Sequence, residues 1–301
     1  MGPSANSREG PRHVRESMST GESVTAGEGG NGIPADGAPL LSLRSVGKSF
    51  GPVRALSHVD LDVPAGRVTA LAGDNGAGKS VTIKTISGLW PPDEGNILWQ
   101  GQPVHLHGPK DAEGLGIRTI YQDLALCDNL DIVQNMFLGH EPLRRGMMDE
   151  DSMEISARKT LDELRVRTVR SIRQPVASLS GGQRQSVAVA KALLANAKLV
   201  ILDEPTAALG VSQTQQVLDL IKRLASRGVA VMVVSHNLID VFEVADRIAI
   251  LYLGRMVAVD EASKFDRQVV VDYMTTGQSS RELQPAGVGG SSSQQTSEGK
   301  R

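Results

Sequence analysis

The sequence predicts an α/β fold built on a mainly parallel β-sheet. Short aliphatic or β-branched runs alternate along the chain with longer helical patterns. The runs around residues 70, 200 and 232 are almost wholly apolar, as expected of strands that are buried on both faces of a parallel sheet. A glycine-rich segment, 73–80, joins the first of these runs to a helical pattern.

The individual elements follow from these patterns in chain order. Strands are predicted at 41–46, 59–63, 68–72, 117–121, 199–202, 229–234 and 247–252. Helices are predicted at 80–88, 151–164, 182–196, 212–226 and 238–244. The tripeptide Leu253-Gly254-Arg255 predicts the turn of a hairpin. Residues 124–178 are mainly helical in pattern and interrupt the alternation, so they predict a helical insertion between two halves of one sheet.

The ends of the chain differ from its middle. Residues 1–39 are rich in Gly, Ser, Pro and Glu, which predicts a disordered arm, and residues 276–301 predict a disordered tail of the same character. The folded domain is therefore expected at 40–275. No run of about 18 apolar residues is present, and residues 1–39 do not read as a secretory signal, so we expect a chain that does not span a membrane by itself.

Composition narrows the function classes. The formal net charge of −2 and the 3% of aromatic residues argue against a broad basic surface or a stacking platform, so no nucleic-acid partner is expected. Hydrophobic residues make up 40% of the 301 residues, enough for a sizeable core. Cys127 is the one cysteine, which excludes an internal disulfide and fits a reducing compartment.

The segment 73–80, hereafter the phosphate loop, carries the first chemical motif. It reads Gly73-Asp74-Asn75-Gly76-Ala77-Gly78-Lys79-Ser80 and fits the pattern G-x-x-x-x-G-K-[ST]. Glycines let backbone N–H groups approach phosphates, and a helix start adds unpaired donors. We expect ATP to contact the loop and Val81, with Lys79 on the β- and γ-phosphates and the Ser80 hydroxyl on Mg²⁺. The alternative is a chance glycine-rich turn, which the flanking strand and helix disfavour.

Two carboxylates, Asp203 and Glu204, end the apolar run 199–202. The C-terminal ends of parallel strands meet at the ligand-binding edge of a sheet, so Asp203 is expected to approach the Mg²⁺ held by Ser80. Glu204 is expected to polarise a water molecule for in-line attack on the γ-phosphate. The alternative is a solvated acidic turn that caps the next helix.

A third motif, Leu179-Ser180-Gly181-Gly182-Gln183, opens another predicted helix. A serine and two glycines at a helix start make an anion-binding cap, which has no obvious role in a P-loop enzyme with one complete site. With the phosphate loop and the Asp203-Glu204 strand, this motif makes the sequence resemble the ATP-binding cassette (ABC) family over residues 40–275. The resemblance implies a P-loop NTPase core, an antiparallel β subdomain and an inserted helical subdomain.

The resemblance also implies roles for single residues. Phe50 looks like the aromatic residue that stacks on adenine, Gln122 like the Q-loop residue that contacts Mg²⁺ and the attacking water, and His236 like the switch histidine that touches the γ-phosphate. Catalysis is thereby assigned to Glu204, His236 and Gln122, and Mg²⁺ to Ser80, Gln122 and Asp203. The alternatives are a core-packing role for Phe50 and a helix-capping role for His236.

In the family, the signature motif faces the phosphate loop of a second subunit. Ser180, Gly181, Gly182 and Gln183 are therefore expected to contact the ATP of a partner cassette, and a homodimer that closes over two ATP molecules is implied. Separate transmembrane permease subunits and, indirectly, a solute-binding protein are the other implied partners. The chain is then expected at the cytoplasmic face of the cell membrane as a peripheral subunit.

One position departs from the family pattern. After Glu204-Pro205-Thr206, many cassettes continue Ser-Ala-Leu-Asp, whereas this chain continues Ala207-Ala208-Leu209-Gly210. The missing aspartate usually bridges the two subunits, so its replacement by Gly210 leaves open how the two sites communicate.

The stretches 120–130, 135–139 and 203–211 are similar to single-cassette importers of monosaccharides of the ribose, xylose and fructose type. The resemblance implies an ATP-hydrolysing subunit that energises such an importer, and it implies a groove around 122–139 that meets the permease. A soluble ABC ATPase acting on DNA or ribosomes and the ATPase subunit of a transporter of a non-sugar solute remain alternatives. Only 100 positions separate Ser80 from Ser180 (180 − 80), too few for the long coiled coil of DNA-repair relatives.

Overall fold

The computed structural model describes residues 39–166, 169 and 171–279, which fall within one compact unit. The predicted arm, 1–39, lies outside the described residues except for Pro39, which opens the first strand. Of the predicted tail, only residues 276–279 are described, and the last helix ends at Thr276.

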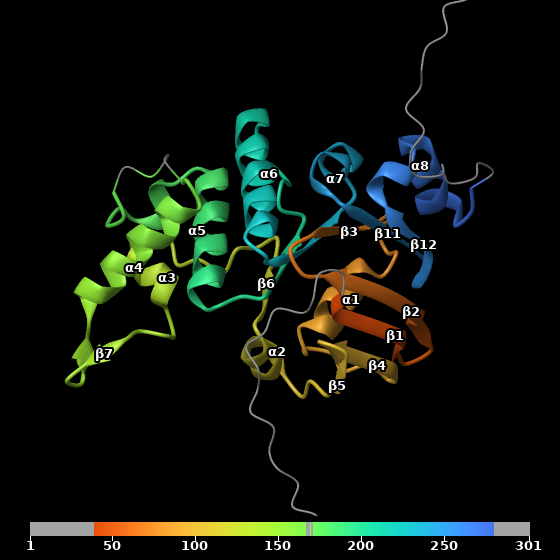
Figure 1. The fold of residues 1–301 in the computed structure, drawn as a ribbon, viewed down its shortest axis with the longest axis horizontal. Helices are drawn as coiled ribbons and strands as arrows, with labels where there is room; N and C mark the ends of the chain where they lie inside the picture. The colour runs from red at the N-terminus through yellow and green to blue at the C-terminus, as the bar shows by residue number, and fades with distance from the viewer. Residues whose placement is uncertain (1–38, 167–168, 170, 280–301) are drawn as a thin grey trace, which may run out of the picture. The chain divides into compact units, whose positions relative to one another are not determined.

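The main sheet is parallel except at one edge (Figure 1). In the described part of the chain it has six strands in the order β12-β11-β3-β10-β9-β6, and only β12 runs antiparallel to its neighbour. Its strands are β3 (Val68–Ala72), β6 (Ile117–Ile120), β9 (Leu199–Asp203), β10 (Ala230–Ser235), β11 (Arg247–Tyr252) and β12 (Arg255–Glu261). The predicted α/β fold with a mainly parallel sheet is confirmed.

A second sheet is antiparallel, with the order β2-β1-β4-β5. Its strands are β1 (Pro39–Phe50), β2 (Val53–Pro64), β4 (Glu94–Trp99) and β5 (Gln102–Val104). The predicted strands 41–46 and 59–63 are the inner parts of β1 and β2. Register shifts along the β1–β2 pair break the simple alternation of buried and exposed residues, which is why the sequence pattern covers only part of each strand.

Five helices coincide with the predicted ones to within two residues at each end: α1 (Lys79–Ile86), α4 (Glu150–Glu163), α5 (Gly181–Leu194), α6 (Val211–Ser226) and α7 (Leu238–Val244). The elements that were not predicted individually are the strands β4 and β5, the helices α2 (Pro109–Leu115), α3 (Ile132–Phe137) and α8 (Arg267–Thr276), and the small hairpin of β7 (Leu143–Arg144) and β8 (Met147–Met148). Single 3₁₀ turns lie at Val176–Ser178 and Ala262–Lys264. The helices α2 and α3 have only seven and six residues, too few to show a 3.6-residue period clearly.

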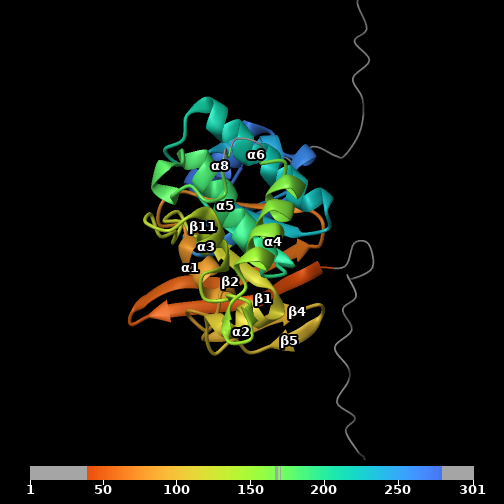
Figure 2. The same ribbon diagram turned by 90° about the vertical axis from the view of Figure 1, so that its left-hand side faces the viewer.

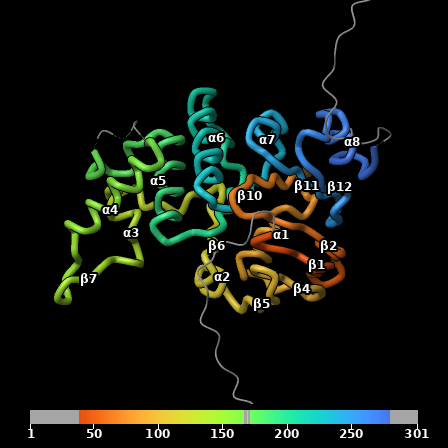
Figure 3. Tube along the Cα trace, in the orientation of Figure 1, coloured from red at the N-terminus to blue at the C-terminus, as the bar shows by residue number. Residues whose placement is uncertain are grey.

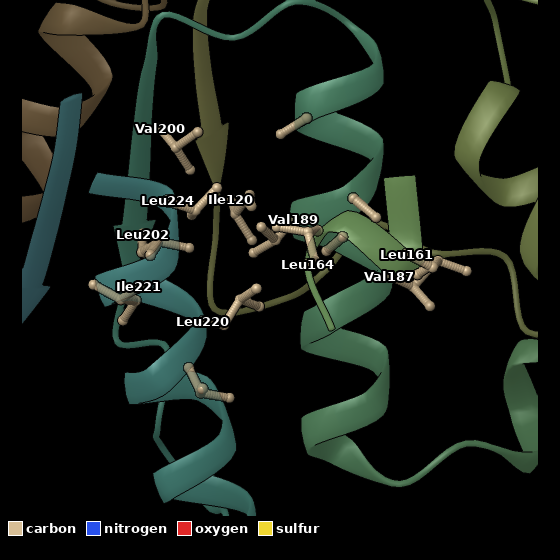
Figure 4. Packing of buried hydrophobic residues seen from close by; sticks show 14 of the residues in the cluster. Ile120, Leu161, Leu164, Val187, Val189, Val200, Leu202, Leu220, Ile221 and Leu224 are labelled. Atoms are coloured by element: carbon tan, nitrogen blue, oxygen red, sulfur yellow. The ribbon is translucent and has the colours of Figure 1, made fainter. Parts of the chain in front are cut away.

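The parallel sheet is buried on both faces, and its strands divide their side chains between two cores. Val200 and Leu202 of β9 point towards Val189 of α5 and Leu224 of α6 (Figure 4). Leu199 and Ile201, which alternate with them along β9, belong instead to the core shared with α1 and the antiparallel sheet. Figures 1 and 2 show α5 and α6 on one side of the parallel sheet and the antiparallel sheet on the other.

The helical insertion leaves the sheet after β6 and returns at β9, which is the neighbouring strand. It contains α3, the β7–β8 hairpin, α4 and α5, and its three helices pack against one another (Figure 3). The predicted inserted helical subdomain is therefore present. No helix among residues 39–166, 169 and 171–279 has both the length and the apolar character needed to cross a bilayer.

Candidate functional site

The carboxyl ends of three neighbouring strands meet at one edge of the parallel sheet. Ala72, which ends β3, pairs with Ser235, which ends β10. Asp203, which ends β9, pairs with Val234 of the same β10. The segments that leave these three strands therefore begin side by side, as expected of a ligand-binding edge in a parallel sheet.

The phosphate loop connects β3 to α1 and depends on its glycines for two reasons. Gly76 and Gly78 have φ values of 82° and 107°, in the left-handed region that favours glycine. Gly73 has no room for a side chain, because a Cβ there would lie 2.5 Å from the backbone oxygen of Leu251. A Cβ at Gly78 would lie 3.1 Å from the backbone oxygen of Ala55 in β2. The loop is thus held between β11 and β2.

Lys79 is the cation of this loop and is only 8% exposed. Its Nζ donates to the carbonyl oxygens of Gly73 at 2.7 Å and Asp74 at 3.1 Å. Carbonyl oxygens bound by an ammonium group can be exchanged for phosphate oxygens, so Lys79 is placed for the predicted contact. Ser80, in the first turn of α1, is exposed, and Val81 is half-buried.

Asp203 is half-buried at the end of β9. Burial raises the pKa of its carboxyl and the adjacent charge of Glu204 raises it further, whereas Lys79 and Lys84 act in the opposite direction. The positive charge of Lys79 therefore acts on the Asp203 carboxylate and favours its ionised form. The Asp203 carboxylate and the Ser80 hydroxyl are hard oxygen donors of the kind that Mg²⁺ prefers, so their chemistry fits the predicted magnesium site.

Glu204 is fixed by two side chains from the end of β10. Its Oε1 lies 2.8 Å from Nδ1 of His236, and its Oε2 accepts a hydrogen bond from Oγ of Ser235 at 3.3 Å. The Glu204 side chain is only 15% exposed, whereas that of His236 is 59% exposed, so the carboxylate is largely covered and the imidazole lies at the surface. Glu204 also has a φ of 47°, a conformation rare for a residue with a side chain, while its N–H donates to the Val234 carbonyl.

The helix-capping alternative for His236 is wrong. The N-cap of α7 is Asn237, whose side chain accepts from the N–H of Ile239. The imidazole of His236 does not cap the helix and instead forms a hydrogen bond with Glu204.

Gln122 lies two residues beyond β6 and is exposed. Because β6 pairs with β9, Gln122 leaves the same edge of the sheet as Asp203. Within the described residues no hydrogen bond ties its side chain to Asp203, Glu204 or His236. The structure thus brings the backbone of Gln122 to the site but does not bond its side chain to the other predicted residues.

Phe50 ends β1 and is 41% exposed, so the core-packing alternative is wrong. It pairs with Val53 across the β1–β2 turn. Two residues further along β2, Ala55 lies beside Gly78 of the phosphate loop. Phe50 is therefore carried on the same pair of strands that contacts this loop.

The signature residues begin α5 with a reciprocal cap. The N–H of Ser180 donates to Oε1 of Gln183 at 2.9 Å, and the N–H of Gln183 donates to Oγ of Ser180 at 3.4 Å. Gly182 is buried against Gln213 of α6, where a Cβ would come within 3.2 Å of the Gln213 Cβ. Figure 1 shows α5 among α3, α4 and α6, apart from α1. The structure does not bring the signature to the phosphate loop of the same chain.

Two further residues at the edge, Ser235 and Thr206, make polar contacts that were not predicted from the sequence. The hydroxyl of Ser235 donates to the Glu204 carboxylate. The same hydroxyl accepts a hydrogen bond from the N–H of Asn237 at 3.0 Å. Thr206 donates to Oδ2 of Asp240 at 2.5 Å and so ties the segment after Glu204 to α7. Their nearness in sequence to the motif residues is the signal that could have indicated them.

Comparison with known families decides the class of the protein. The family model described as "ABC transporter" matches residues 56–207, about half of the chain. The chain belongs to this family. It is accordingly an ATP-binding protein whose ATPase activity is coupled to transport.

The curated relatives of this ABC protein include two of similar length. It is 46% identical to the fructose import ATP-binding protein FrcA of Rhizobium meliloti, over 79% of this chain and 94% of that protein. It is 44% identical to the xylose/arabinose import ATP-binding protein XylG of Sulfolobus acidocaldarius, again over 79% and 94%. A ribose import ATP-binding protein of Rubrobacter xylanophilus is 42% identical over 73% of this chain but only 44% of its own length.

Solved ABC cassettes share the fold. An ATP-binding cassette of an ABC transporter superposes with a TM-score of 0.70 at 24% identity, over 79% of this chain and 98% of that one. A dimeric cassette, solved in a post-hydrolysis state with ADP and Pi, has a TM-score of 0.62 at 26% identity, over 75% of this chain and all of that one (100%).

Proposed function

We propose that the chain binds ATP with Mg²⁺ at the sheet edge described above and hydrolyses it to drive the import of a monosaccharide. The observation that carries the hydrolytic role is the convergence of the phosphate loop, Asp203 and the Glu204–His236 pair at one edge. These are the parts that phosphoryl transfer to water requires: a cradle, a cation site and a base.

Each side chain has a defined task in this proposal. Glu204 accepts a proton from the attacking water, while His236 and Ser235 hold its carboxylate in place. The water oxygen bonds to the γ-phosphorus as the bond to the β–γ bridging oxygen breaks, which yields ADP and phosphate. Lys79 and the loop N–H groups neutralise charge on the phosphate oxygens. Ser80, Asp203 and Gln122 would hold Mg²⁺, which would supply further charge neutralisation to the phosphates when bound.

A second copy of the chain completes each site. The start of α5 offers Ser180 and two glycines as an anion-binding cap, and it lies away from α1 of its own chain (Figure 1). We assign this cap to the γ-phosphate bound by a partner subunit. ATP then bridges the two copies, and hydrolysis removes the bridge.

The variant Glu204→Gln tests the dimer. It is expected to bind ATP, to hydrolyse it slowly and to elute from gel filtration as a dimer only when ATP and Mg²⁺ are present. Adding Ser180→Arg to this variant, which obstructs the cap without touching the phosphate loop, should return the protein to a monomer. A Glu204→Gln protein that stays monomeric with ATP while still binding it would contradict the proposed assembly.

The proposed contact with a permease is a groove of about 390 Å³ formed by α2, β6, the segment after β6, α3 and α5. Its lining is chiefly apolar and includes Ala112, Ile120, Leu124, Met136 and Phe137. A groove of this kind accepts the apolar face of a short amphipathic helix. We therefore assign it to a cytoplasmic helix of separate permease subunits, which would hold the chain at the cytoplasmic face of the membrane and link it indirectly to a solute-binding protein.

The class of cargo is proposed from the relatives. The two relatives of similar length are named for fructose import and for xylose/arabinose import, and two longer relatives, each matched over less than half of its length, are named for ribose and xylose import. These names share one chemistry, a free monosaccharide. No residue of the ATPase site discriminates among them.

Uptake measurements test the transport role. Deleting the chain from its host should abolish uptake of one labelled monosaccharide among fructose, xylose, arabinose and ribose, while uptake of a labelled amino acid is unchanged. The wild-type chain should restore uptake and Glu204→Gln should not. Unchanged uptake of all four sugars, with the chain recovered on ribosomes or nucleoids, would overturn the importer role in favour of a soluble ABC ATPase.

A further inference from the structure

The loop between α1 and β4 is bonded to the end of β1 that carries Phe50. Lys48 Nζ donates to Oδ1 of Asp93 at 2.8 Å and to the carbonyl of Pro91 at 2.7 Å. The other carboxylate oxygen of Asp93 accepts the N–H of Ser49 at 2.7 Å. Two successive prolines, at 91 and 92, restrict the backbone of this loop. The last three residues of β1 are thus pinned to a stiff segment that begins at the end of α1.

The same loop places an aromatic ring against Phe50. The rings of Phe50 and Trp90 are 4.8 Å apart between centroids and inclined at 70°, an edge-to-face arrangement. Trp90 is held in turn by Lys84 of α1, whose Nζ lies 4.4 Å from the centre of the Trp90 ring. A continuous set of contacts therefore runs from α1, the helix that follows the phosphate loop, through Trp90 to Phe50.

We propose that Trp90 is a positioning residue for the nucleotide base, because it holds the Phe50 ring in the orientation that stacks on adenine. The inference rests on the proposed stacking role of Phe50. Phe50 keeps 41% of its surface exposed beside Trp90, so a planar base can still reach its ring. Without Trp90, the Phe50 side chain would be free to rotate, and base binding would have to immobilise it.

The contact geometry distinguishes this role from ordinary packing. Trp90 is half-buried and Phe50 exposed, so neither belongs to the main cores. The other tryptophan, Trp99 in β4, is 5% exposed and lies within the core of the antiparallel sheet. Trp99 therefore serves as the matched control for a tryptophan substitution that does not face the nucleotide.

The test compares ATP with inorganic tripolyphosphate, which has the phosphates but no base. Titration calorimetry with Mg²⁺ should show that Trp90→Ala raises the Kd for ATP about 3- to 10-fold, the range expected for the loss of one aromatic pair. The Kd for tripolyphosphate should be unchanged, and KM for ATP should rise with kcat unchanged. Trp90→Phe should restore most of the affinity for ATP, and Trp99→Phe should resemble the wild type.

A second measurement leaves the Phe50–Trp90 contact intact. In Trp99→Phe, Trp90 is the sole remaining tryptophan of the chain, and its fluorescence should change on adding ATP but not on adding tripolyphosphate. Equal responses to both ligands would contradict a base-specific role.

Phe50→Ala separates the possible failures. If Phe50→Ala weakens ATP binding and Trp90→Ala does not, the positioning role of Trp90 is refuted while stacking by Phe50 stands. If neither change weakens ATP binding, both roles fall. If Trp90→Ala weakens ATP and tripolyphosphate by the same factor, Trp90 supports the phosphate loop and the proposal is also refuted.

Discussion

Gly210 replaces the aspartate that many cassettes carry after the catalytic glutamate, and its surroundings show that an aspartate would fit. It is the N-cap of α6, with φ −72° and ψ 161°, which is the extended backbone that capping residues adopt. No atom lies within 4 Å of the position that a Cβ would take. The carbonyl of Gly210 already accepts from the N–H groups of Gln213 and Thr214 at 2.9 Å, and the first turn of α6 contains no acidic residue.

Gly210→Asp should therefore stabilise the folded chain. An aspartate in place of glycine at an N-cap adds a few tenths of a kcal/mol through its side-chain cap. Its charge at the start of the helix dipole adds about 0.3–1 kcal/mol. Removing a glycine from the unfolded chain adds about 0.4–1 kcal/mol. Because these terms overlap, we expect a net gain of roughly 1 kcal/mol, or about 2–4 °C in Tm for a domain of this size.

Urea and thermal unfolding of the isolated chain, without nucleotide, measure this gain. Gly210→Ala is the matched control, since it also removes a glycine but supplies no cap or charge, and it should fall below Gly210→Asp by about 1 kcal/mol. Equal stabilities of the two variants would refute the capping argument. A Gly210→Asp protein less stable than the wild type would refute the unobstructed geometry on which the argument depends.

Three further predictions concern the site and the core. Lys79→Ala should weaken ATP binding about 10- to 100-fold in calorimetry, because the loop loses its charged donor to phosphate; unaltered affinity would contradict the placement of this lysine. Asp203→Asn should raise Tm at pH 7 without Mg²⁺, because the folded state raises the pKa of Asp203 and so disfavours its ionised form. That gain in Tm is fully present above the raised pKa and disappears as the pH falls below the ordinary pKa of about 3.9. A gain in Tm that grew on acidification would contradict a raised pKa for Asp203. Leu224→Ala, at a fully buried site (0% exposed), should reduce the unfolding free energy by about 2–5 kcal/mol, whereas Ile155→Ala, 67% exposed, should change it by less than about 0.5 kcal/mol.

The local patterns of the sequence account for most of the parallel sheet and for the long helices. The strands β9 and β10 are apolar up to their last residues, Asp203 and Ser235, because both faces of the sheet are covered. The hairpin turn at Leu253 and Gly254 was also predicted correctly, and its two residues have φ values of 44° and 76°.

The strand β4 shows why part of the antiparallel sheet was missed. It begins with three exposed residues, including Gly95, which resemble a loop in the sequence. Gly95 has a φ of 79°, and a Cβ there would lie 2.3 Å from the backbone oxygen of Ser45. The reason for glycine at this position is thus the neighbouring strand β1, which a local pattern cannot reveal.

The motifs predicted that the phosphate loop, Asp203, Glu204 and His236 lie at one edge of the sheet, but not how these residues bond to one another. The Glu204–His236 contact joins residues 32 positions apart, and it depends on β9 and β10 being neighbours in register. The Phe50–Trp90 contact depends on β4 pairing with β1. Both follow from strand order, which composition and periodicity do not determine.

In the proposed function, Glu204 activates water for hydrolysis at an edge of the sheet where ATP binds independently of Glu204. The most direct measurement is the release of phosphate from ATP by purified wild type and Glu204→Gln, with ATP affinity measured on the same preparations. We predict that kcat falls by about 10²–10⁴-fold in Glu204→Gln, as for loss of a general base, while the Kd for ATP is retained. Hydrolysis at the wild-type rate by Glu204→Gln would contradict the account, as would a loss of hydrolysis fully explained by a loss of ATP binding.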